Sequence, residues 1–273
     1  MADPLPVRAF VIDLDGVLWR GRDLLPGAID FLRFIETRAL PFCLASNNAT
    51  LTIESVQGRL GPSGIRLTAE HLVTSADAAA GYIRRHYPRP PSVFAIGEES
   101  LRRALVEAGC SLLESADNAG IVVVGMDREL TWRKIVEAGL AIAAGAVFIG
   151  TNPDRTFPTE RGIGPGNGAI LAALETATGR APLIVGKPEP HLFLEATSRL
   201  GVPPAETLVV GDRLETDIAG GARAGMQTAL LLTGVTAVAD LPGRDVRPDW
   251  TFEDLPALLR RLPDWVARPG GQP

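Results

Sequence analysis

Short apolar runs that alternate with amphipathic segments are the feature that most constrains how this chain folds. Residues 8–14 read RAFVIDL, a nearly continuous apolar run typical of a parallel strand that is buried on both faces. Further strands are predicted at 41–45, 71–74, 183–186, 207–211 and 227–232, with helices at 26–37, 52–60, 190–200 and up to residue 225. Strands that alternate with helices predict an α/β fold, in which a doubly wound parallel sheet has helices on both sides.

The stretch between these two halves carries strands and helices of its own. They are predicted at 93–96, 121–124 and 147–149 for strands, and at 100–108, 131–144 and 168–178 for helices. Because this stretch is long enough to form a domain, we expect a core domain made of 1–79 and 183–273, with a smaller α/β domain, 80–182, inserted into it. The segments YPRPP (87–91) and Ala181-Pro182 mark the approximate boundaries, and residues 268–273 are expected to form a loose tail.

Composition argues against several classes of protein. Twenty-seven basic and 32 acidic residues give a net charge of −5, which disfavours nucleic acid as a partner. The longest nearly apolar run, 138–150, is shorter than the roughly 18 residues of a membrane span, and no basic segment typical of a secretory signal precedes Asp13. Cys43 and Cys110 are too few for a disulfide framework or a zinc cage. We therefore expect a cytoplasmic protein with no membrane partner.

Two aspartates, Asp13 and Asp15, stand at the predicted carboxyl end of the first strand. The two-residue period of a strand points both side chains to one side, and Gly16 lets the chain turn away at the edge where parallel α/β sheets bind ligands. Two neighbouring carboxylates repel each other unless a divalent cation lies between them or one stays protonated. The alternative is a solvated strand end without a function.

Polar residues also follow two other predicted strands. Ser46, Asn47 and Asn48 lead into a helix, whose N–H groups and positive dipole end suit a phosphate; a plain helix cap is the alternative. Lys187 follows the strand at 183–186, in a chain whose 27 basic residues include only one other lysine, Lys134. An ammonium group in that gap suits a phosphoryl oxygen, whereas an ordinary surface charge is the alternative.

The strand at 207–211 runs into GDRLETD, which adds two more carboxylates. Asp212 would join the first pair as a hard oxygen ligand, and Asp217, at the start of the next helix, would accept hydrogen bonds from N–H groups or from metal-bound water. Four predicted strand ends therefore carry D-x-D, S-N-N, K and G-D-x-x-x-x-D in chain order.

The chain resembles the haloacid dehalogenase superfamily of phosphatases on the motifs DLDGVLWRG, SNNAT, TNPD, PGNGA, GKP and VVGDRLETDI. Their order and spacing match the NagD-like branch, which includes 4-nitrophenyl, pyridoxal and phosphoglycolate phosphatases. The resemblance covers nearly the whole chain. It implies a Rossmann-like core that hydrolyses phosphate esters and an inserted domain that acts as a cap.

The resemblance also implies a role for each site residue. Asp13 attacks phosphorus to form an aspartyl phosphate, while Asp15 protonates the leaving oxygen and later activates water. Mg²⁺ is held by the Asp13 carboxylate, the Asp15 main-chain carbonyl and Asp212, with Asp217 in its outer surroundings. The phosphoryl oxygens are bound by four polar residues: Ser46, Asn47, Asn48 and Lys187. At position 46 many relatives have threonine, which carries the same hydroxyl.

In the family the cap selects the leaving group, and here the loop 152–167 is the natural candidate for that role. Asn152, Asp154 and Arg155 are its candidate substrate contacts. A solvated loop held by Pro153 and Pro158 is the alternative. The expected partner is a small phosphorylated metabolite, and a homo-oligomer through the cap is a further expectation. Sugar phosphates, nucleotides, pyridoxal phosphate and phosphoglycolate all fit a capped site of this kind.

Two other functions are compatible with parts of this pattern. A non-catalytic protein of this fold that binds a phosphorylated metabolite is the main alternative, although it would not need both a nucleophile and an acid. An NAD-type dehydrogenase is suggested by the glycines of 164–169, but that motif needs a preceding strand, and 158–164 is predicted not to be one. Trp19 and Trp132 are predicted either to pack in the core or to contact the cap.

Overall fold

The computed structural model describes residues 6–89, 91–159, 161–241 and 243–266. The chain divides into two compact units. The first takes the described residues of Met1–Ser46, Ile53–Val73 and Pro188–Pro273, and the second takes those of Asn47–Thr52 and Thr74–Lys187. The predicted tail at 268–273 lies outside the described residues, as does Pro90 in the predicted boundary segment.

The first unit is built on a six-stranded sheet in the order β15-β14-β13-β1-β4-β5. Its strands are β1 (Ala9–Ile12), β4 (Phe42–Ser46), β5 (Leu72–Thr74), β13 (Thr207–Gly211), β14 (Gln227–Leu231) and β15 (Trp250–Phe252). β1 runs parallel to both β13 and β4, and Ile12 lies opposite Val210 and Leu44. The three central strands therefore end at one level, which brings the residues after them to a common edge.

Helices pack on this sheet through their apolar faces. They are α1 (Ala28–Thr37), α2 (Ile53–Leu60), α7 (His191–Leu200), α8 (Ala219–Arg223) and α9 (Leu255–Trp265). Short 3₁₀ turns lie at Gly61–Ser63, Ala69–His71, Pro204–Glu206 and Val238–Asp240, and a π-helical turn at Leu214–Ile218. The α1 face meets β1 where the ring of Phe31 stands edge-on to Phe10, with centroids 5.7 Å apart. A hairpin formed by β2 (Trp19–Arg20) and β3 (Asp23–Leu24) follows β1.

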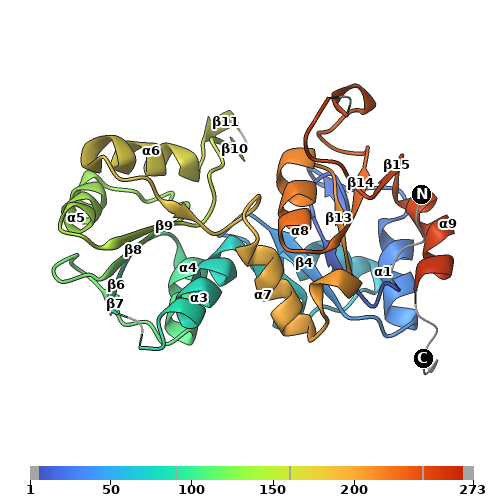
Figure 1. Ribbon diagram of the computed structural model, residues 1–273, viewed down its shortest axis with the longest axis horizontal. Helices are drawn as coiled ribbons and strands as arrows, with labels where there is room; N and C mark the ends of the chain where they lie inside the picture. Colours follow the sequence, from blue (N-terminus) through green and yellow to red (C-terminus); the bar gives the residue numbers. More distant parts are fainter. Residues whose placement is uncertain (1–5, 90, 160, 242, 267–273) are drawn as a thin grey trace. The chain divides into compact units, whose positions relative to one another are not determined.

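The second unit has its own parallel sheet in the order β12-β9-β8-β6-β7. Its strands are β6 (Val93–Ile96), β7 (Leu112–Leu113), β8 (Ile121–Val124), β9 (Val147–Gly150) and β12 (Leu183–Ile184), and its helices are α3 (Ser75–His86), α4 (Glu99–Glu107), α5 (Trp132–Ala143) and α6 (Asn167–Thr178). Figure 1 shows α5 and α6 on one side of this sheet and α3 and α4 on the other. Parallel strands covered on both faces confirm the α/β class predicted for the chain.

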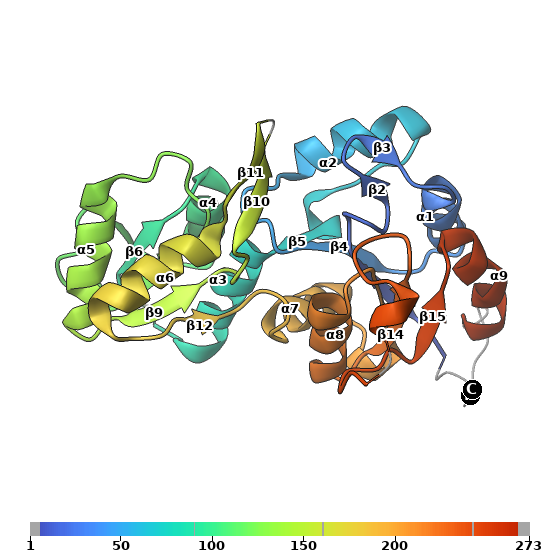
Figure 2. The same cartoon turned by 90° about the horizontal axis from the view of Figure 1, so that it is seen from above.

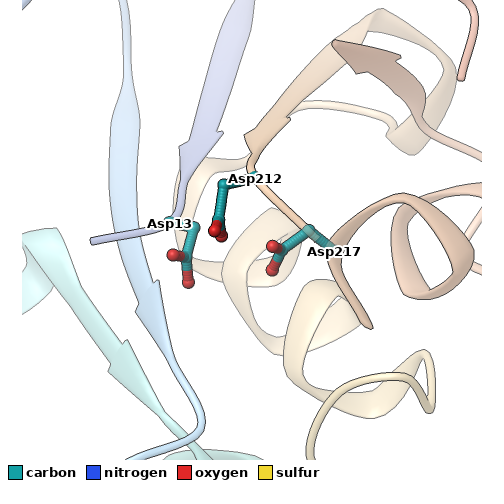
Figure 3. Close-up of side chains that lie close together, drawn as sticks. All are labelled: Asp13, Asp212 and Asp217. Carbon is teal, nitrogen blue, oxygen red and sulfur yellow. The ribbon is translucent and has the colours of Figure 1, made fainter. Parts of the chain in front are cut away.

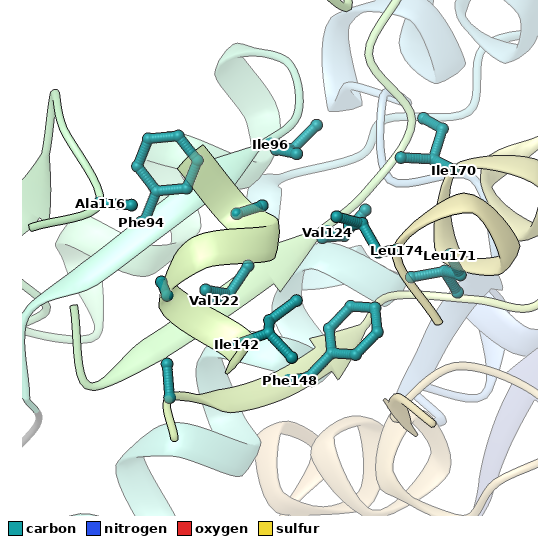
Figure 4. Packing of buried hydrophobic residues seen from close by; sticks show 13 residues of the cluster. Phe94, Ile96, Ala116, Val122, Val124, Ile142, Phe148, Ile170, Leu171 and Leu174 are labelled. Atoms are coloured by element: carbon teal, nitrogen blue, oxygen red, sulfur yellow. The ribbon is translucent and has the colours of Figure 1, made fainter. Parts of the chain in front are cut away.

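The core under α5 and α6 shows why this unit folds as it does (Figure 4). Alternate residues of β6 and β8 point to one face, so that Phe94, Ile96, Val122 and Val124 form a continuous apolar layer. The helices cover that layer with residues spaced three and four apart, including Ala138, Ala141 and Ile142 from α5 and Ile170, Leu171 and Leu174 from α6.

Three predicted elements differ from the structure. The strand expected at 183–186 belongs to the second sheet, because β12 pairs with β9 and not with a strand of the first unit. The segment 158–164, expected not to be a strand, contributes to the antiparallel hairpin of β10 (Thr156–Thr159) and β11 (Gly162–Pro165), which Figure 2 shows beside α6. β1 ends at Ile12, so Asp13 and Asp15 lie beyond the strand whose two-residue period was used to orient them.

No helix in the described part of the chain is long and apolar enough to cross a membrane.

Candidate active site

Three aspartates meet at the carboxyl edge of the first sheet (Figure 3). Asp13 follows β1, Asp212 follows β13, and Asp217 lies in the π-helical turn after it. Each offers a carboxylate oxygen that lies within 4.8 Å of one from each of the other two. Asp212 and Asp217 are each only 1% exposed, while Asp13 is partly exposed. Among the described residues this cluster takes in Asp217 and leaves out the side chain of Asp15.

Main-chain donors hold two of these carboxylates in place. The Val235 N–H donates to Asp212 Oδ2 at 2.7 Å, and the Arg213 N–H donates to Asp217 Oδ2 at 3.1 Å. Thr236 supports the same loop, since its N–H donates to the Asp212 carbonyl at 3.2 Å and its hydroxyl accepts from the Leu214 N–H at 3.0 Å. The segment after β14 therefore fixes Asp212, a contribution that the D-x-D and G-D motifs did not reveal.

Glycines make room for the buried carboxylates. A Cβ on Gly16, whose φ of +87° is itself unfavourable for other residues, would lie 2.5 Å from Asp212 Oδ2. A Cβ on Gly234 would overlap the same carboxylate, and one on Gly211 would overlap the Asp217 side chain. Gly16 is therefore needed for two reasons: it lets the chain turn after the strand, as predicted, and it leaves room for the Asp212 side chain.

The donor set of this cluster fits a hard divalent cation. Three carboxylates this close repel one another, and burial increases that repulsion because less water screens it. A cation between the oxygens converts the repulsion into attraction, and Mg²⁺ takes carboxylate oxygens together with water. Asp13, Asp212 and Asp217 therefore have the chemistry and the spacing to hold Mg²⁺.

Asp15 is engaged separately from the cluster. Its side chain is exposed, and its Oδ1 accepts a hydrogen bond from the indole Nε1 of Trp19 at 2.9 Å. Trp19 is 2% exposed, so of the two interpretations left open for this residue, packing in the core is the one observed.

Asn47 and Lys187, 140 positions apart, are joined by two hydrogen bonds. The Lys187 N–H donates to Asn47 Oδ1 at 2.7 Å, and Asn47 Nδ2 donates to the Lys187 carbonyl at 3.0 Å. Ser75 and Asn152 both donate to the Asn47 carbonyl, at 2.6 Å and 2.8 Å. The Asn47 side chain therefore fixes the backbone at Lys187, a residue that is 3% exposed. Ser75 had no distinguishing signal in the sequence.

Ser46 and Asn48 flank Asn47 in different surroundings. Ser46 is the last residue of β4 and is 8% exposed. Asn48 Oδ1 accepts from the Thr50 N–H at 3.0 Å and from the Thr50 hydroxyl at 2.8 Å, which closes a local turn. α2 begins only at Ile53, so Ser46, Asn47 and Asn48 do not lead directly into a helix N-terminus as predicted.

The loop predicted to select substrate is tied down at one end. Asn152 is 4% exposed, and its Oδ1 accepts from the Asp154 N–H at 3.1 Å while its Nδ2 reaches the Asn47 carbonyl. Asn167 Nδ2 donates to the Asn152 carbonyl at 2.8 Å. Arg155 is exposed and Asp154 partly exposed, whereas Asn152 is buried.

The glycines of 164–169 allow close backbone packing in this loop and do not form a dinucleotide-binding motif. β10 and β11 pair antiparallel with each other, whereas a dinucleotide motif needs a strand of a parallel sheet before the helix. A Cβ on Gly168 would lie 2.5 Å from the Pro153 carbonyl oxygen, and one on Gly166 would overlap the Asp154 carbonyl. Close backbone packing therefore accounts for both glycines.

The other lysine has a structural role. Lys134 Nζ lies 2.7 Å from Asp127 Oδ2, in an ion pair whose carboxylate side chain is 3% exposed, and it also donates to the Glu129 carbonyl at 3.2 Å. This pair secures the loop between β8 and α5.

In a doubly wound α/β unit ligands bind at the carboxyl edge of the central strands, and the carboxylates of this chain gather at that edge. Two family models match the chain, one described as haloacid dehalogenase-like hydrolase over residues 10–111 and one as HAD-hydrolase-like over 184–258. The acid sugar phosphatase of Staphylococcus aureus (strain USA300) is 38% identical over 255 residues, covering 93% of this chain and 98% of that protein.

Solved structures agree with these matches. NagD from Escherichia coli K-12 has a TM-score of 0.84 at 33% identity, covering 92% of this chain and 98% of that one. The 4-nitrophenylphosphatase from Thermotoga maritima has a TM-score of 0.84 at 31% identity, covering 94% and 97%. The chain belongs to the haloacid dehalogenase-like hydrolases, in their NagD-like branch, and is a hydrolase of the phosphatase class. The family and the reaction class predicted from the motifs are confirmed.

Proposed function

We propose that this protein is a Mg²⁺-dependent phosphatase that hydrolyses a small phosphomonoester through an aspartyl phosphate on Asp13. The observation that carries this proposal is the meeting of Asp13, Asp212 and Asp217 within 4.8 Å at the sheet edge. In this role Mg²⁺ neutralises charge on the phosphoryl oxygens and on the carboxylates around it. Asp13 and Asp212 are its proposed side-chain ligands, with the Asp15 carbonyl as a third, and Asp217 assists from the same cluster.

The proposed reaction has two displacements at phosphorus. In the first, a carboxylate oxygen of Asp13 bonds to phosphorus, the bond from phosphorus to the ester oxygen breaks, and Asp15 gives that oxygen its proton. In the second, Asp15 takes a proton from water while the water oxygen bonds to phosphorus, and the bond from phosphorus to Asp13 breaks. Inorganic phosphate leaves, and both aspartates return to their starting states.

Phosphate binding is assigned to Ser46, Asn47, Asn48 and Lys187. The hydroxyl of Ser46 and the ammonium group of Lys187 supply donors for charge on the equatorial oxygens. Because the Asn47 side chain bonds the Lys187 backbone, its contribution is to fix Lys187 and to offer its own main-chain N–H. Asn48 shapes the turn that carries these groups.

The second unit is proposed to act as the cap, with Asp154 and Arg155 as substrate contacts and Asn152 holding their loop. The Staphylococcus aureus relative is named an acid sugar phosphatase and the Thermotoga maritima relative a 4-nitrophenylphosphatase, which supports a small phosphorylated metabolite as the substrate. A cytoplasmic location and a homo-oligomer through the second unit stay predictions. The exposed apolar side chains Trp132 and Leu140 on α5, 80% and 65% exposed, support the latter.

A phosphate-release screen tests this proposal. Sugar phosphates, nucleotides, pyridoxal phosphate, phosphoglycolate and 4-nitrophenyl phosphate are incubated with the protein, with and without Mg²⁺. We expect release from at least one of them that depends on Mg²⁺ and is abolished in Asp13→Asn. Unchanged release by Asp13→Asn refutes the nucleophile, and tight binding without turnover in Mg²⁺ favours the non-catalytic alternative.

A further inference from the structure

We propose that Trp19 is a positioning residue, which holds the Asp15 carboxylate in the orientation needed for proton transfer to the leaving group. This inference rests on the proposed function of Asp15 as the acid and base of the reaction. Its starting point is the hydrogen bond of 2.9 Å from the Trp19 indole Nε1 to Asp15 Oδ1.

The two partners differ sharply in exposure. Trp19 is 2% exposed, whereas the side chain it bonds is exposed at the carboxyl edge of the sheet. A buried indole has one donor and no acceptor, and it generally finds a partner for its N–H. An exposed aspartate samples several rotamers when nothing holds it. The hydrogen bond from the buried indole therefore restricts the Asp15 side chain to one orientation.

The turn between the two residues fixes both ends of this bond. The Leu18 and Trp19 N–H groups donate to the Leu14 carbonyl at 2.9 Å and 3.2 Å, and the Gly16 N–H donates to the Trp19 carbonyl at 2.7 Å. The Thr233 hydroxyl donates to the Gly16 carbonyl at 2.6 Å, which ties the turn to the segment that carries Val235.

The indole ring is held from its face as well. The Arg59 guanidinium lies over the ring, 4.7 Å from its centroid, and Arg59 Nη1 donates to the Gly21 carbonyl at 2.9 Å. The arginine thus bridges the ring and the β2–β3 hairpin. With the backbone and the ring both constrained, the direction of the indole N–H is set by the fold and does not depend on a ligand.

This bond assigns separate tasks to the two carboxylate oxygens of Asp15. Oδ1 accepts the indole N–H, so Oδ2 is the oxygen that carries the proton and delivers it to the ester oxygen. Proton transfer needs the acid within hydrogen-bond reach of the leaving oxygen, and a fixed Oδ2 keeps that distance from one turnover to the next. The sequence leaves Trp19 open between core packing and cap contact; the structure shows core packing, and the positioning of Asp15 is a role beyond it.

The leaving group distinguishes positioning from packing. A 4-nitrophenolate ion is a weak base that departs without much protonation, whereas the alkoxide of an alkyl phosphate departs only when it receives a proton. Loss of an oriented acid therefore slows the first displacement more for alkyl phosphates than for 4-nitrophenyl phosphate. The ratio kcat/KM reports that step, because the second displacement, in which Asp15 acts as the base, is common to both substrates. General damage to the fold slows both to the same extent.

The test compares kcat and KM of the Mg²⁺-loaded wild type and Trp19→Phe on 4-nitrophenyl phosphate and glycerol 2-phosphate. Trp19→Phe keeps an aromatic ring and removes the N–H. We expect its kcat/KM on glycerol 2-phosphate to fall by about 10-fold to 100-fold, part of the roughly 100-fold or more that acid–base catalysis supplies. We expect kcat/KM on 4-nitrophenyl phosphate to fall much less. Trp250→Phe, at a partly buried position of β15, is the matched control and should match the wild type on both substrates.

Equal losses of kcat/KM on the two substrates, or no loss on either, overturn the proposal. If Trp19→Phe does not fold, as judged by circular dichroism, β-(3-benzothienyl)alanine at position 19 replaces the N–H by sulfur at nearly the same size, and the same selective loss is required of it. Asp15→Asn separates this inference from the proposed function. If that variant hydrolyses glycerol 2-phosphate at the wild-type rate, Asp15 is not the acid and the proposed function fails, whatever Trp19 does.

Discussion

Neutralising Asp217 tests whether the aspartate cluster is a cation site. In Asp217→Asn the side chain keeps its shape. Its amide oxygen can still accept the hydrogen bond that the Arg213 N–H donates to Asp217 Oδ2 at 3.1 Å in the wild type. The change removes two of the three carboxylate pairs, whose oxygens lie within 4.8 Å of one another. At an effective dielectric constant of about 20, each such pair costs about 3.5 kcal/mol, and in bulk water about 0.9 kcal/mol.

The expected gain follows from these limits. Relief of two pairs is worth about 2 to 7 kcal/mol, and replacing a charged acceptor by a neutral one at the Arg213 N–H costs about 1 kcal/mol. Without metal, Asp217→Asn should therefore be more stable than the wild type by at least 1 kcal/mol, which for a chain of this size raises Tm by about 2 to 4 °C.

With Mg²⁺ the advantage of Asp217→Asn should shrink. A ligand at 100 times its Kd stabilises the native state by about 2.7 kcal/mol, and a tenfold loss of affinity removes about 1.4 kcal/mol of this. Differential scanning calorimetry in EDTA and in Mg²⁺ measures both effects. Asp264→Asn, at an exposed carboxylate of α9, is the control and should show neither. A lower Tm for Asp217→Asn in EDTA, with an undiminished Mg²⁺ shift, would refute the reasoning.

Three further predictions concern other parts of the structure. Gly234→Ala should weaken Mg²⁺ binding in isothermal titration calorimetry, because its Cβ would displace the Asp212 carboxylate; unchanged affinity contradicts this. Lys134→Met should lower the free energy of unfolding, measured in urea, by about 1 to 3 kcal/mol, because it leaves the buried Asp127 carboxylate without its ion pair. The partial exposure of the lysine keeps this loss below that of a fully buried pair, and a loss below about 0.5 kcal/mol is the contrary result. Burial raises the pKa of the Cys110 thiol, so a smaller fraction of it is thiolate at pH 8 in the folded protein than in the unfolded protein. Iodoacetamide should therefore modify Cys110 more slowly in the folded than in the urea-unfolded protein, and equal rates would contradict this prediction.

The strands of both sheets could be predicted well where they are buried on both faces. The strands expected at 93–96, 121–124 and 207–211 match β6, β8 and β13 residue for residue, because a fully buried parallel strand is a continuous apolar run between polar turns. Sheet membership was harder to predict. Leu183–Ile184 has the same apolar character in either sheet, and only its pairing with β9 decides where it lies.

The site could be predicted in its charged residues and not in its supporting ones. Asp13, Asp212 and Asp217 were singled out because acidic residues at strand ends are unusual in composition and position. Trp19 gave no such signal, since a tryptophan after a strand is as typical of a core as of a site, and its bond to Asp15 depends on the turn geometry. The bonds between Asn47 and Lys187 join residues 140 positions apart, which no local pattern encodes.

The six residues Asn47–Thr52 group with the second unit although they directly continue a strand of the first. Anyone transplanting that unit into a relative, or exchanging it between homologues, would have to move two separate pieces of chain. A graft of 74–187 alone would bring Ser75 and Asn152 without the carbonyl to which they donate, and Lys187 without the amide that holds its backbone. The smallest exchangeable module is therefore discontinuous, with one part only six residues long.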